Sequence, residues 1–589
     1  MQLANFRKIK IIYMINTIKS SILKKRNLVF LLPLSIYGIW ILIIYLYGVN
    51  IPILDQWKVP GKQIESFFNN QLSFTLLYSQ HNESRKLIPN LIFVILAAIL
   101  KEWNVKAEMI IGLLFAFLMS VIIYFLLLLT NKSFYKNIFL LTIYELLLLS
   151  PSSFSRWLRG ITIHRLIPDA CLIVNALIFR LNINQNLKIY LYSFFCIVAQ
   201  YSFSGGIVTW FVSLIFIVFN NKLSLKEKFK SLCLFIGFFA ISTICYFINY
   251  VQPSSHTKPS EIVKSSWQDI ISYFSAFLGN ILGEAYELDI LIGLILLISF
   301  TLLLILNFKF LKEEIIVWFA IGFYTIALGI INTITRLPMS NSANSHAIRV
   351  DYITHLVYLP LSIIVIILYL LDYKNKNNQM FKNLSFYSLG IITAFYISKN
   401  YPTKILHELQ EWQYNYNYSK SCIQLVNIYQ KNDCIMLVLP SVEPKYSLNL
   451  NLVITKFKNL NQLNVVKPGI VKDIKIYSQG EWGYIDSIQE DQNGFFNISG
   501  WAKLQTRVAD SVILAYPNES NALIVVDILS IGQVRQDISK FYGLKYQNSG
   551  WSGYVDLKSK IPNFNKSYIQ GYAFDAKQNI FYPLKSSHS

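Results

Sequence analysis

The chain has few charged residues. Only 14% of its 589 residues are Asp, Glu, Lys or Arg, against about a quarter in soluble domains. Hydrophobic residues make up 54% of the chain, and its mean hydropathy is +0.42. Apolar runs recur along the chain, and several are close in length to a membrane-spanning helix, which needs about 20 residues. These features exclude an ordinary soluble domain and predict a polytopic membrane protein.

Acidic residues are especially scarce. The chain has 32 acidic and 53 basic residues, which gives a formal net charge of +21. Such an excess in a soluble protein would suggest nucleic acid as a partner. Here no patch of Lys and Arg is interleaved with aromatic residues on a polar surface. The basic residues lie in short loops between apolar runs, where they determine membrane topology. Nucleic acid is therefore set aside.

Cysteine is also sparse, and no two of the six form a CxxC pair. Cys171, Cys196, Cys233 and Cys245 lie in apolar runs and are predicted to pack as small hydrophobic residues. Cys422 and Cys434 lie in a polar region and could pair on an oxidising side of a membrane. A signal-peptide cleavage site is missing after the first apolar run, so 1–27 is predicted to be a basic cytoplasmic N-terminus before a retained helix.

The apolar runs predict eleven membrane-spanning helices. The run 90–100, between Pro89 and Lys101, is too short to cross about 30 Å of bilayer at about 1.5 Å per residue. It is predicted to be an amphipathic helix lying at the interface. The spans are expected at 28–49, 107–130, 137–150, 167–181, 188–203, 205–219, 232–251, 288–307, 315–333, 354–371 and 384–399.

Charge bias orients these spans. With the N-terminus in the cytoplasm, inner segments carry 20 Lys and Arg residues, and the short outer loops 151–166, 252–287 and 334–353 carry 7. Cytoplasmic loops are the ones enriched in Lys and Arg. The asymmetry favours an odd number of spans and an extracytoplasmic C-terminal part, in a bacterial inner (plasma) membrane. A full crossing by 90–100 would reverse the bias.

Hydropathy falls after residue 401. The region 401–478 is predicted to be an extracytoplasmic linker with one helix ("KILHELQEWQYNYNYSKSCIQLVNIYQ") and one short strand ("CIMLVLP"). The region 479–589 contains short β-rich runs separated by Gly, Asn and Pro, which predicts a β-sandwich. Trp501 and Trp551 are predicted to fill its core, and sugar-stacking surfaces are the alternative.

The first outer loop, 50–106, holds the densest polar cluster, "LDQW" followed by "QHNESRK". Asp55 lies a few residues beyond the first span, where a lipid-phosphate donor would present its leaving group. A carboxylate there could take the proton of an acceptor hydroxyl, and cations could stabilise the departing phosphate. The alternative is a solvated charge or an Asx turn.

The remaining candidate residues are predicted to bind substrate. Trp57 is typical of a membrane interface. Asp169 begins a predicted span, where a carboxylate flags function, although a helix N-cap after Pro168 is the alternative. A divalent cation held by His81, Glu83 and either His164 or Asp169 is a further alternative, but the spacing matches no known ligand motif. The cationic candidates, whose alternative is anchoring to lipid headgroups, are Arg85, Lys86, Arg159, Arg165, Arg336 and Arg349.

This layout resembles the GT-C membrane glycosyltransferases, most closely the aminoarabinose and protein O-mannosyl transferases. The resemblance rests on a first span, an outer loop with an early Asp, the Pro-containing helix of "RKLIPNLIFVILAAILKEWNVKAEM", the Ser150–Pro151 pair and "IPDACLIVNALIF", and covers about 28–400. The "LDQW…QHNESRKLIPNLI" stretch is also similar to bacterial membrane proteins with a "DQW…QHNEHR" pattern. The C-terminal region resembles "GWA"-type modules attached to bacterial glycosyltransferases.

The resemblance implies transfer of a sugar from a polyprenyl-phosphate carrier to a surface glycan, lipid or protein on the outer face. It implies that Asp55 acts as the base. Some members carry paired acids where this sequence has a single Asp, and Glu83 is the candidate for the second. Two alternatives remain: a glycolipid transporter or flippase, and a non-catalytic scaffold for surface polysaccharide assembly. A transporter predicts repeats and mid-span charges, and Glu145 is the main such charge.

Overall fold

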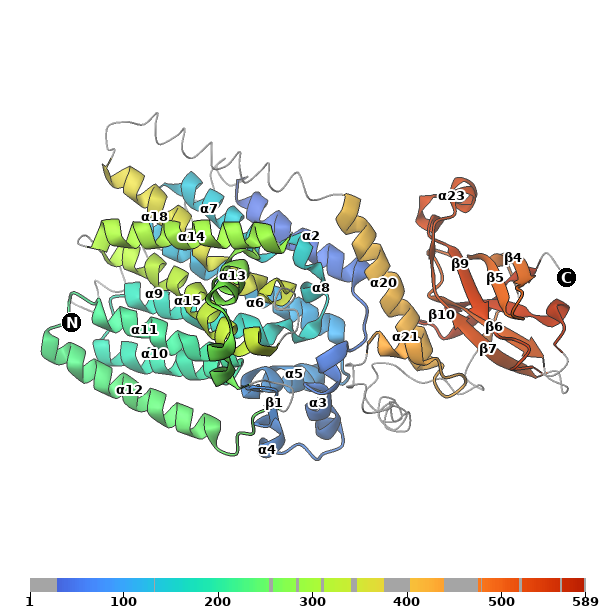
Figure 1. The fold of residues 1–589 in the computed structure, drawn as a ribbon, viewed down its shortest axis with the longest axis horizontal. Helices are drawn as coiled ribbons and strands as arrows, with labels where there is room; N and C mark the ends of the chain where they lie inside the picture. The colour runs from blue at the N-terminus through green and yellow to red at the C-terminus, as the bar shows by residue number, and fades with distance from the viewer. Residues whose placement is uncertain are drawn as a thin grey trace.

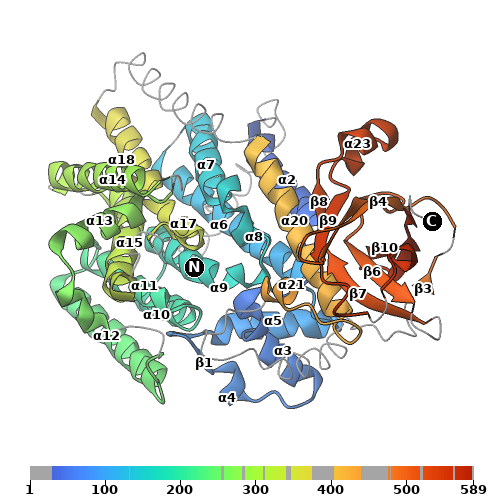
Figure 2. The ribbon, with the colours of Figure 1, turned by 45° about the vertical axis from the view of Figure 1, so that its right-hand side comes forward.

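The computed structural model describes residues 29–131, 133–253, 258–281, 285–308, 312–339, 347–374, 403–438, 475–477, 479–517, 522–561 and 564–586. A large helical part and a smaller β part lie at opposite ends of the molecule, with the helix α20 (Thr403–Gln424) between them (Figures 1 and 2). Helix α20 contacts α2 (Leu31–Tyr47) on one side and strand β8 (Ile531–Gln533) on the other.

Within the described residues, seven helical segments are long and apolar enough to cross a membrane. They are Val105–Thr130, Phe134–Trp157, Gly160–Arg180, Leu225–Phe247, Tyr286–Asn307, Glu313–Arg336 and Val350–Asp372. The long helices in these segments are α6 (Val105–Thr130), α7 (Phe134–Leu148), α9 (Ile163–Arg180), α12 (Leu225–Phe247), α14 (Tyr286–Asn307), α15 (Glu313–Arg336) and α18 (Tyr358–Lys374).

Seven of the eleven predicted spans correspond to these segments. Three others form shorter helices: α2, α10 (Gln185–Gln200), and α11 (Val208–Val218) with the 3-10 turn that precedes it. The last predicted span, 384–399, lies outside the described residues, as does the basic segment 1–27. The predicted outer loop 252–287 contains a helix, α13 (Trp267–Gly279), which packs against α14.

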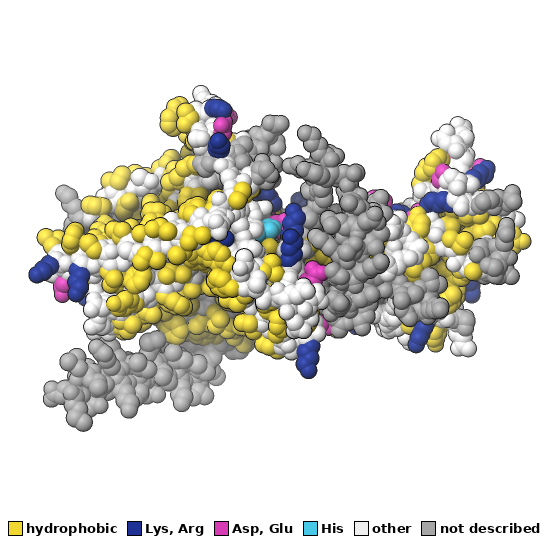
Figure 3. Space-filling view, turned by 90° about the horizontal axis from the view of Figure 1, so that it is seen from below, with side chains coloured by type: hydrophobic (Ala, Val, Ile, Leu, Met, Phe, Trp, Pro, Cys, Tyr) yellow, Lys and Arg dark blue, Asp and Glu magenta, His cyan; other side chains and the backbone are white. Residues whose placement is uncertain are grey.

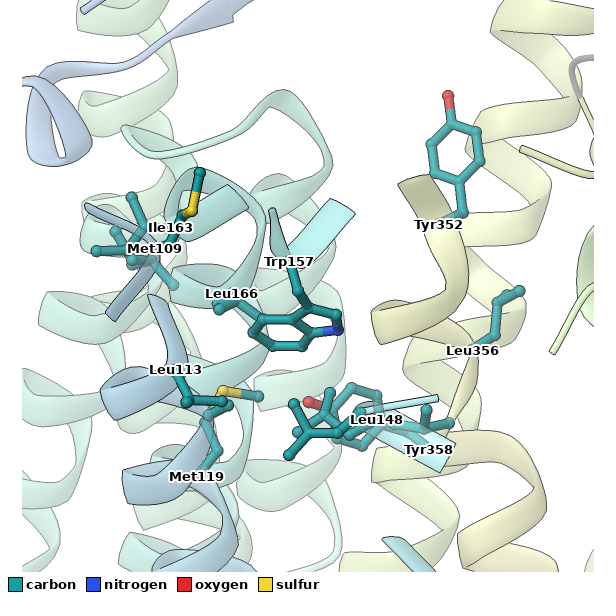
Figure 4. Close-up of a cluster of buried hydrophobic side chains, with 14 of the residues drawn as sticks. Met109, Leu113, Met119, Leu148, Trp157, Ile163, Leu166, Tyr352, Leu356 and Tyr358 are labelled. Atoms are coloured by element: carbon teal, nitrogen blue, oxygen red, sulfur yellow. The ribbon is translucent and has the colours of Figure 1, made fainter. Parts of the chain in front are cut away.

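The first outer loop folds as short helices around a two-residue hairpin. Helices α3 (Gly61–Phe68) and α4 (Phe74–Leu77) precede strands β1 (Gln80–His81) and β2 (Ser84–Arg85), which pair antiparallel. Helix α5 (Leu87–Leu100) follows and is the predicted short apolar helix. Helices α6 and α9, the short helix α8 (Phe154–Trp157) and the segment around Tyr358 contribute side chains to one buried cluster, including Met109, Trp157 and Leu166 (Figure 4).

Helix α20 ends in a hairpin with α21 (Asn432–Met436), and a disulfide between Cys422 and Cys434 joins the two helices. The predicted helix at 404–430 is confirmed over most of its length, and the two cysteines pair. The predicted strand "CIMLVLP" is wrong for its described part, which is helical up to Met436. A short apolar run cannot be assigned to strand or helix from periodicity alone, and here the disulfide fixes Cys434 against α20.

The β part consists of two five-stranded sheets, in the orders β3-β11-β10-β6-β7 and β12-β4-β5-β9-β8. Alternating inward residues of both sheets, such as Ile498 and Val512, share one core. Trp501 and Trp551 belong to that core and are buried, so the core prediction is confirmed. The bounds are β3 (Lys475–Ile476), β4 (Gly483–Glu490), β5 (Phe496–Ala502), β6 (Ser511–Pro517), β7 (Leu523–Leu529), β8, α23 (Gln536–Tyr542), β9 (Gly550–Val555), β10 (Gln570–Asp575), β11 (Ile580–Pro583) and β12 (Lys585–Ser586).

The helical part exposes much apolar surface. Leu, Ile and Phe side chains of α12 and α14 point outward, and hydrophobic side chains cover most of the visible face in Figure 3. Cys171 and Cys196 are buried as predicted, whereas the same prediction is wrong for Cys233 and Cys245 because they lie on exposed positions of α12. An apolar run alone does not tell which face of a helix meets other helices.

Candidate functional site

A cavity of about 410 Å³ opens where the first outer loop meets the segment 156–165, Arg336 and the segment 349–352; we call it the polar cavity. Near the middle of the view in Figure 3, a histidine side chain lies beside Lys or Arg and Asp or Glu side chains. The charged and histidine side chains that line the polar cavity are Asp55, Lys58, His81, Glu83, Lys86, Arg156, Arg159, His164, Arg165, Arg336, Arg349 and Asp351. The first outer loop and later segments thus form one site.

Asp55 lies in a 3-10 turn, Leu54–Trp57, at the edge of the polar cavity. Its side chain is 51% exposed, so an incoming group can reach the carboxylate. Leu54 just before it has a φ of +52°, a left-handed conformation that costs a non-glycine residue about 1–2 kcal/mol. Strain of this kind persists only where surrounding contacts over-determine it.

A buried carboxylate holds the inner side of this turn. Glu108 on α6 accepts hydrogen bonds from Gln56 Nε2 at 3.0 Å and from Trp103 Nε1 at 2.8 Å. Gly160 packs directly against this pair, since a Cβ there would lie 2.0 Å from Glu108 Oε2 and 3.0 Å from Gln56 Nε2. Glycine at position 160 is therefore required for the Glu108–Gln56 contact.

The carbonyl of Val438 holds the outer side of the turn. It accepts hydrogen bonds from the backbone N–H of Leu54 at 2.7 Å and from Trp57 Nε1 at 3.0 Å. Trp57 is buried and does not line the polar cavity, so its predicted contact with substrate is replaced by a structural role. The α20–α21 hairpin, which ends at Val438, thus fixes the position of Asp55.

His81 and Lys86 form a buried pair behind Asp55. Lys86 Nζ donates to His81 Nδ1 at 3.2 Å, and His81 Nε2 lies 4.0 Å from Asp55 Oδ1. Burial, with Lys86 nearby, lowers the pKa of His81 to about 4, so the ring is neutral at neutral pH. Burial lowers the pKa of Lys86 to about 8, against the opposing effect of Asp55. Near neutral pH, Lys86 supplies the positive charge of this pair.

Asp351, which the sequence analysis missed, organises the basic residues. Its carboxylate lies 3.9 Å from Arg159, 3.7 Å from Arg165 and 3.2 Å from Arg349. Its backbone carbonyl also accepts hydrogen bonds from Arg156 and Arg165, each at 2.6 Å. The four guanidinium groups are thereby held around one side of the polar cavity.

The polar cavity has an excess of positive charge. Seven basic side chains line it against the three carboxylates of Asp55, Glu83 and Asp351. Among the described residues, two nitrogens of the buried Arg156 and Nε of Arg159 have no hydrogen-bond partner. Buried donors without partners are rare in folded proteins. An anion that enters this cavity would satisfy them, and guanidinium groups match phosphate oxygens in geometry.

A second cavity, of about 370 Å³, adjoins the first; we call it the apolar cavity. Glu83, Phe203, Arg336 and Tyr352 line both cavities, and Arg336 forms an ion pair with Glu83 between them. The other lining residues include aromatic and aliphatic side chains from α11, α12, α13 and α15 and their flanking loops: Ile207, Tyr246, Phe247, Tyr250, Phe277, Leu328 and Ile331. A charged head and an apolar tail could occupy the two cavities together.

Besides Trp57, two more predicted substrate-binding residues line neither cavity. Arg85 is buried and donates to the backbone carbonyls of Tyr246 at 2.7 Å and Tyr78 at 3.1 Å, so it fastens the hairpin to the end of α12. Asp169 is fully buried within α9. Helix α9 begins at Ile163, so Asp169 lies inside the helix and the N-cap alternative is wrong, while a functional role for Asp169 stays a prediction.

The other predicted residues do line the polar cavity: Asp55, His81, Asn82, Glu83, Lys86, Arg159, His164, Arg165, Arg336 and Arg349. Asn82, with a φ of +51°, forms the turn between β1 and β2 that brings its neighbours inward. In the described part of the chain, no group of three or more His, Cys, Asp or Glu side chains could hold a metal ion. The alternative of a divalent cation held by His81, Glu83 and either His164 or Asp169 therefore has no such group among the described residues.

Three charged residues of the polar cavity escaped the sequence analysis: Lys58, Arg156 and Asp351. Asp351 had a signal, since it stands two residues after Arg349 and opens an apolar run, as a carboxylate in a charge-poor chain. His355, which lines the apolar cavity, carried no comparable signal.

No protein-family model, curated protein or solved structure matches the chain.

Proposed function

We propose that the protein is a membrane glycosyltransferase that moves a sugar from a polyprenyl-phosphate-linked donor to a hydroxyl of a cell-surface glycan, lipid or protein. The paired cavities carry this proposal. The apolar cavity suits a prenyl chain, and the adjoining polar cavity offers guanidinium donors for a phosphate. Asp55, at the edge of the polar cavity and half exposed, is open to an acceptor hydroxyl. The resemblance in layout to GT-C enzymes points the same way.

In this mechanism Asp55 takes the proton of the acceptor hydroxyl as the hydroxyl oxygen attacks the anomeric carbon. The carbon–oxygen bond to the phosphate breaks, and the electron pair stays on the lipid phosphate. Arg156, Arg159 and Arg336 stabilise the charge that develops there, because preorganised donors act on the transition state at little reorganisation cost. The Glu83–Arg336 ion pair argues against Glu83 as a second base and favours a role in positioning Arg336.

We further propose that the helical part lies in a bacterial inner (plasma) membrane with eleven spans, the N-terminus inside and the β part outside. Arg180 and Lys222 pair with Glu313 at the start of α15, whereas Arg336 at its end lines the cavities. The 24 residues of α15 separate the two polar ends by about 36 Å. The Cys422–Cys434 disulfide, on the side of Asp55, suits an oxidising compartment.

The experiment is an Asp55→Asn substitution in a strain that lacks its native copy, with the surface glycans and glycolipids profiled. We expect loss of the product, at least 100-fold, because removal of a general base costs about 10²–10⁴-fold in rate. Glu65→Gln, on α3 of the same outer loop but lining neither cavity, is the matched control and should leave the profile unchanged. An unchanged profile in the Asp55→Asn strain would remove Asp55 as the base. If the protein were instead a flippase, the Asp55→Asn variant would still translocate lipid across the membrane.

A further inference from the structure

A buried aspartate–histidine pair lies beside the apolar cavity. Asp169 Oδ1 on α9 is 2.7 Å from Nδ1 of His355, which lies on the short helix α17 (Ile353–Leu356). Tyr324 on α15 donates its hydroxyl to the same Oδ1 at 2.9 Å. Asp169 and Tyr324 are 0% exposed and His355 is 1% exposed. A carboxylate so enclosed fixes the orientation of the imidazole.

The second ring nitrogen of His355, Nε2, is the one that does not contact Asp169. Nδ1 is used by Asp169, and within the described part of the chain Nε2 has no hydrogen-bond partner although it is buried. His355 lines the apolar cavity. An unsatisfied buried polar atom costs about 1–3 kcal/mol, and such atoms in folded proteins call for a functional explanation. A ligand in that cavity could supply the missing partner.

The position of His355 defines which part of a ligand it would meet. Phe203 stacks on the imidazole with ring centroids 5.9 Å apart and planes 14° apart, and Arg165 lies 5.6 Å from the centre of the Phe203 ring. Phe203 and Tyr352 line both cavities. His355 therefore lies near the boundary at which an apolar chain would end and a charged head would begin.

We propose that His355, oriented by Asp169, binds the phosphate of the lipid donor from the apolar side and donates its Nε2 proton to the departing phosphate oxygen. The identity of the ligand rests on the proposed function. In the transfer step, the bond between the anomeric carbon and the phosphate oxygen breaks. That oxygen keeps the electron pair and takes the His355 proton, while the acceptor proton goes to Asp55. Solvent then returns a proton to His355 and removes one from Asp55.

Charged and titratable groups from several elements lie around His355. Asp169 on α9, in direct contact, favours the imidazolium. Arg156 and Arg165 oppose it, and Tyr324 on α15 and Tyr358 on α18 are neutral neighbours of Asp169. Glu83 and Arg336 line the same cavity as a pair. An arriving phosphate adds a negative charge on the open side of the ring, so proton uptake by His355 and phosphate binding should favour each other.

The test measures binding to the purified full-length protein in detergent between pH 5 and 9. The probe is farnesyl methyl phosphate, a prenyl phosphodiester whose single charge is constant over this range. In the wild-type protein, we expect affinity to fall as pH rises. His355→Gln should bind the probe about tenfold more weakly at the acid end, as expected for loss of a charge-assisted hydrogen bond, and should lose the part of the pH dependence due to His355. Asp169→Asn should act in the same direction.

Matched probes and variants make the outcome decisive. Farnesol should bind with the same affinity at every pH in the wild type and in His355→Gln. His407→Gln, on α20 and lining neither cavity, should behave as wild type. The proposal is overturned if His355→Gln keeps the full pH dependence, if the probe does not bind, or if dimethyl phosphate binds as well as the probe. Because no sugar is present in the assay, normal binding without glycosyl transfer in cells would overturn the proposed function and the proton donation by His355, and would leave its phosphate binding in place.

Discussion

The polar and apolar cavities lie side by side but are built differently. The polar cavity is assembled from loops and helix ends, and hydrogen bonds and charges fix its side chains: Glu108 and Val438 hold the Asp55 turn, and Asp351 holds the guanidinium groups. The apolar cavity is lined mainly by helix side chains and their flanking loops, whose positions follow from packing. We therefore expect single charge or glycine changes to damage the first cavity and leave the second able to bind an apolar chain.

The largest effect is expected from Asp351→Asn. This change leaves Arg159, Arg165 and Arg349 around an uncharged, mostly buried side chain, and breaking a buried ion pair costs about 3 kcal/mol. Thermal unfolding in detergent should show a clearly lower Tm, and binding of a prenyl phosphodiester should weaken while farnesol binding persists. The matched control is Asp372→Asn, which removes a single, more exposed pair with Lys136 and should cost less than about 1 kcal/mol. Equal effects of the two changes would contradict the organising role of Asp351.

A smaller effect is expected from Gly160→Ala. The added methyl would meet Glu108 Oε2 at 2.0 Å, so the Glu108–Gln56 contact must open and the Asp55 turn must shift. A displacement of about 1 Å in a catalytic group can cost about 100-fold in rate. Turnover should therefore fall 10- to 100-fold, with farnesol binding unchanged.

Gly112→Ala provides the comparison for that change. Gly112 lies on α6, the helix that carries Glu108, and an added Cβ would meet nothing within 4 Å. Turnover in Gly112→Ala should equal that of wild type. If both alanine variants lost activity equally, general damage to the helical part would explain the loss, and the Glu108 contact would not.

The smallest effect concerns pH. The pKa of Lys86 lies at about 8, so this side chain is charged below that value and loses its charge as pH rises through it. Affinity for a prenyl phosphodiester should therefore weaken several-fold between pH 7 and 9. In Lys86→Arg the charge persists over this range, and the basic limb of the binding profile should flatten. Lys62→Arg, an exposed change on α3, is the control and should keep the wild-type pH profile of binding. If the Lys86→Arg profile were identical to that of Lys62→Arg, Lys86 would be excluded as the cause of the weaker binding at high pH.

Much of the helical part could be predicted from the sequence, because apolar runs and charge bias report directly on burial. The grouping of Asp55, His81, Lys86 and the arginines also followed, since residues of outer loops must meet on one side. Side-chain direction could not be predicted. The Arg85 side chain points away from the cavity and donates to a backbone carbonyl of α12. The Asp169 side chain points into the interior of the helical part. Both side chains nevertheless lie close to residues that line the cavities. Asp351 escaped because its importance depends on Arg159 and on Arg165, which lies 186 residues earlier, as well as on its neighbour Arg349.

The Val438 carbonyl has a consequence for biosynthesis. This carbonyl accepts hydrogen bonds from the side chain of Trp57, a residue 381 positions earlier in the sequence, and from the backbone N–H of Leu54. When the ribosome has synthesised only the first helices, Val438, which fixes the position of Asp55, is therefore still missing. Under the proposed function and orientation, Asp55 would therefore stay inactive in the nascent polypeptide until the segment up to Val438 has been synthesised and exported.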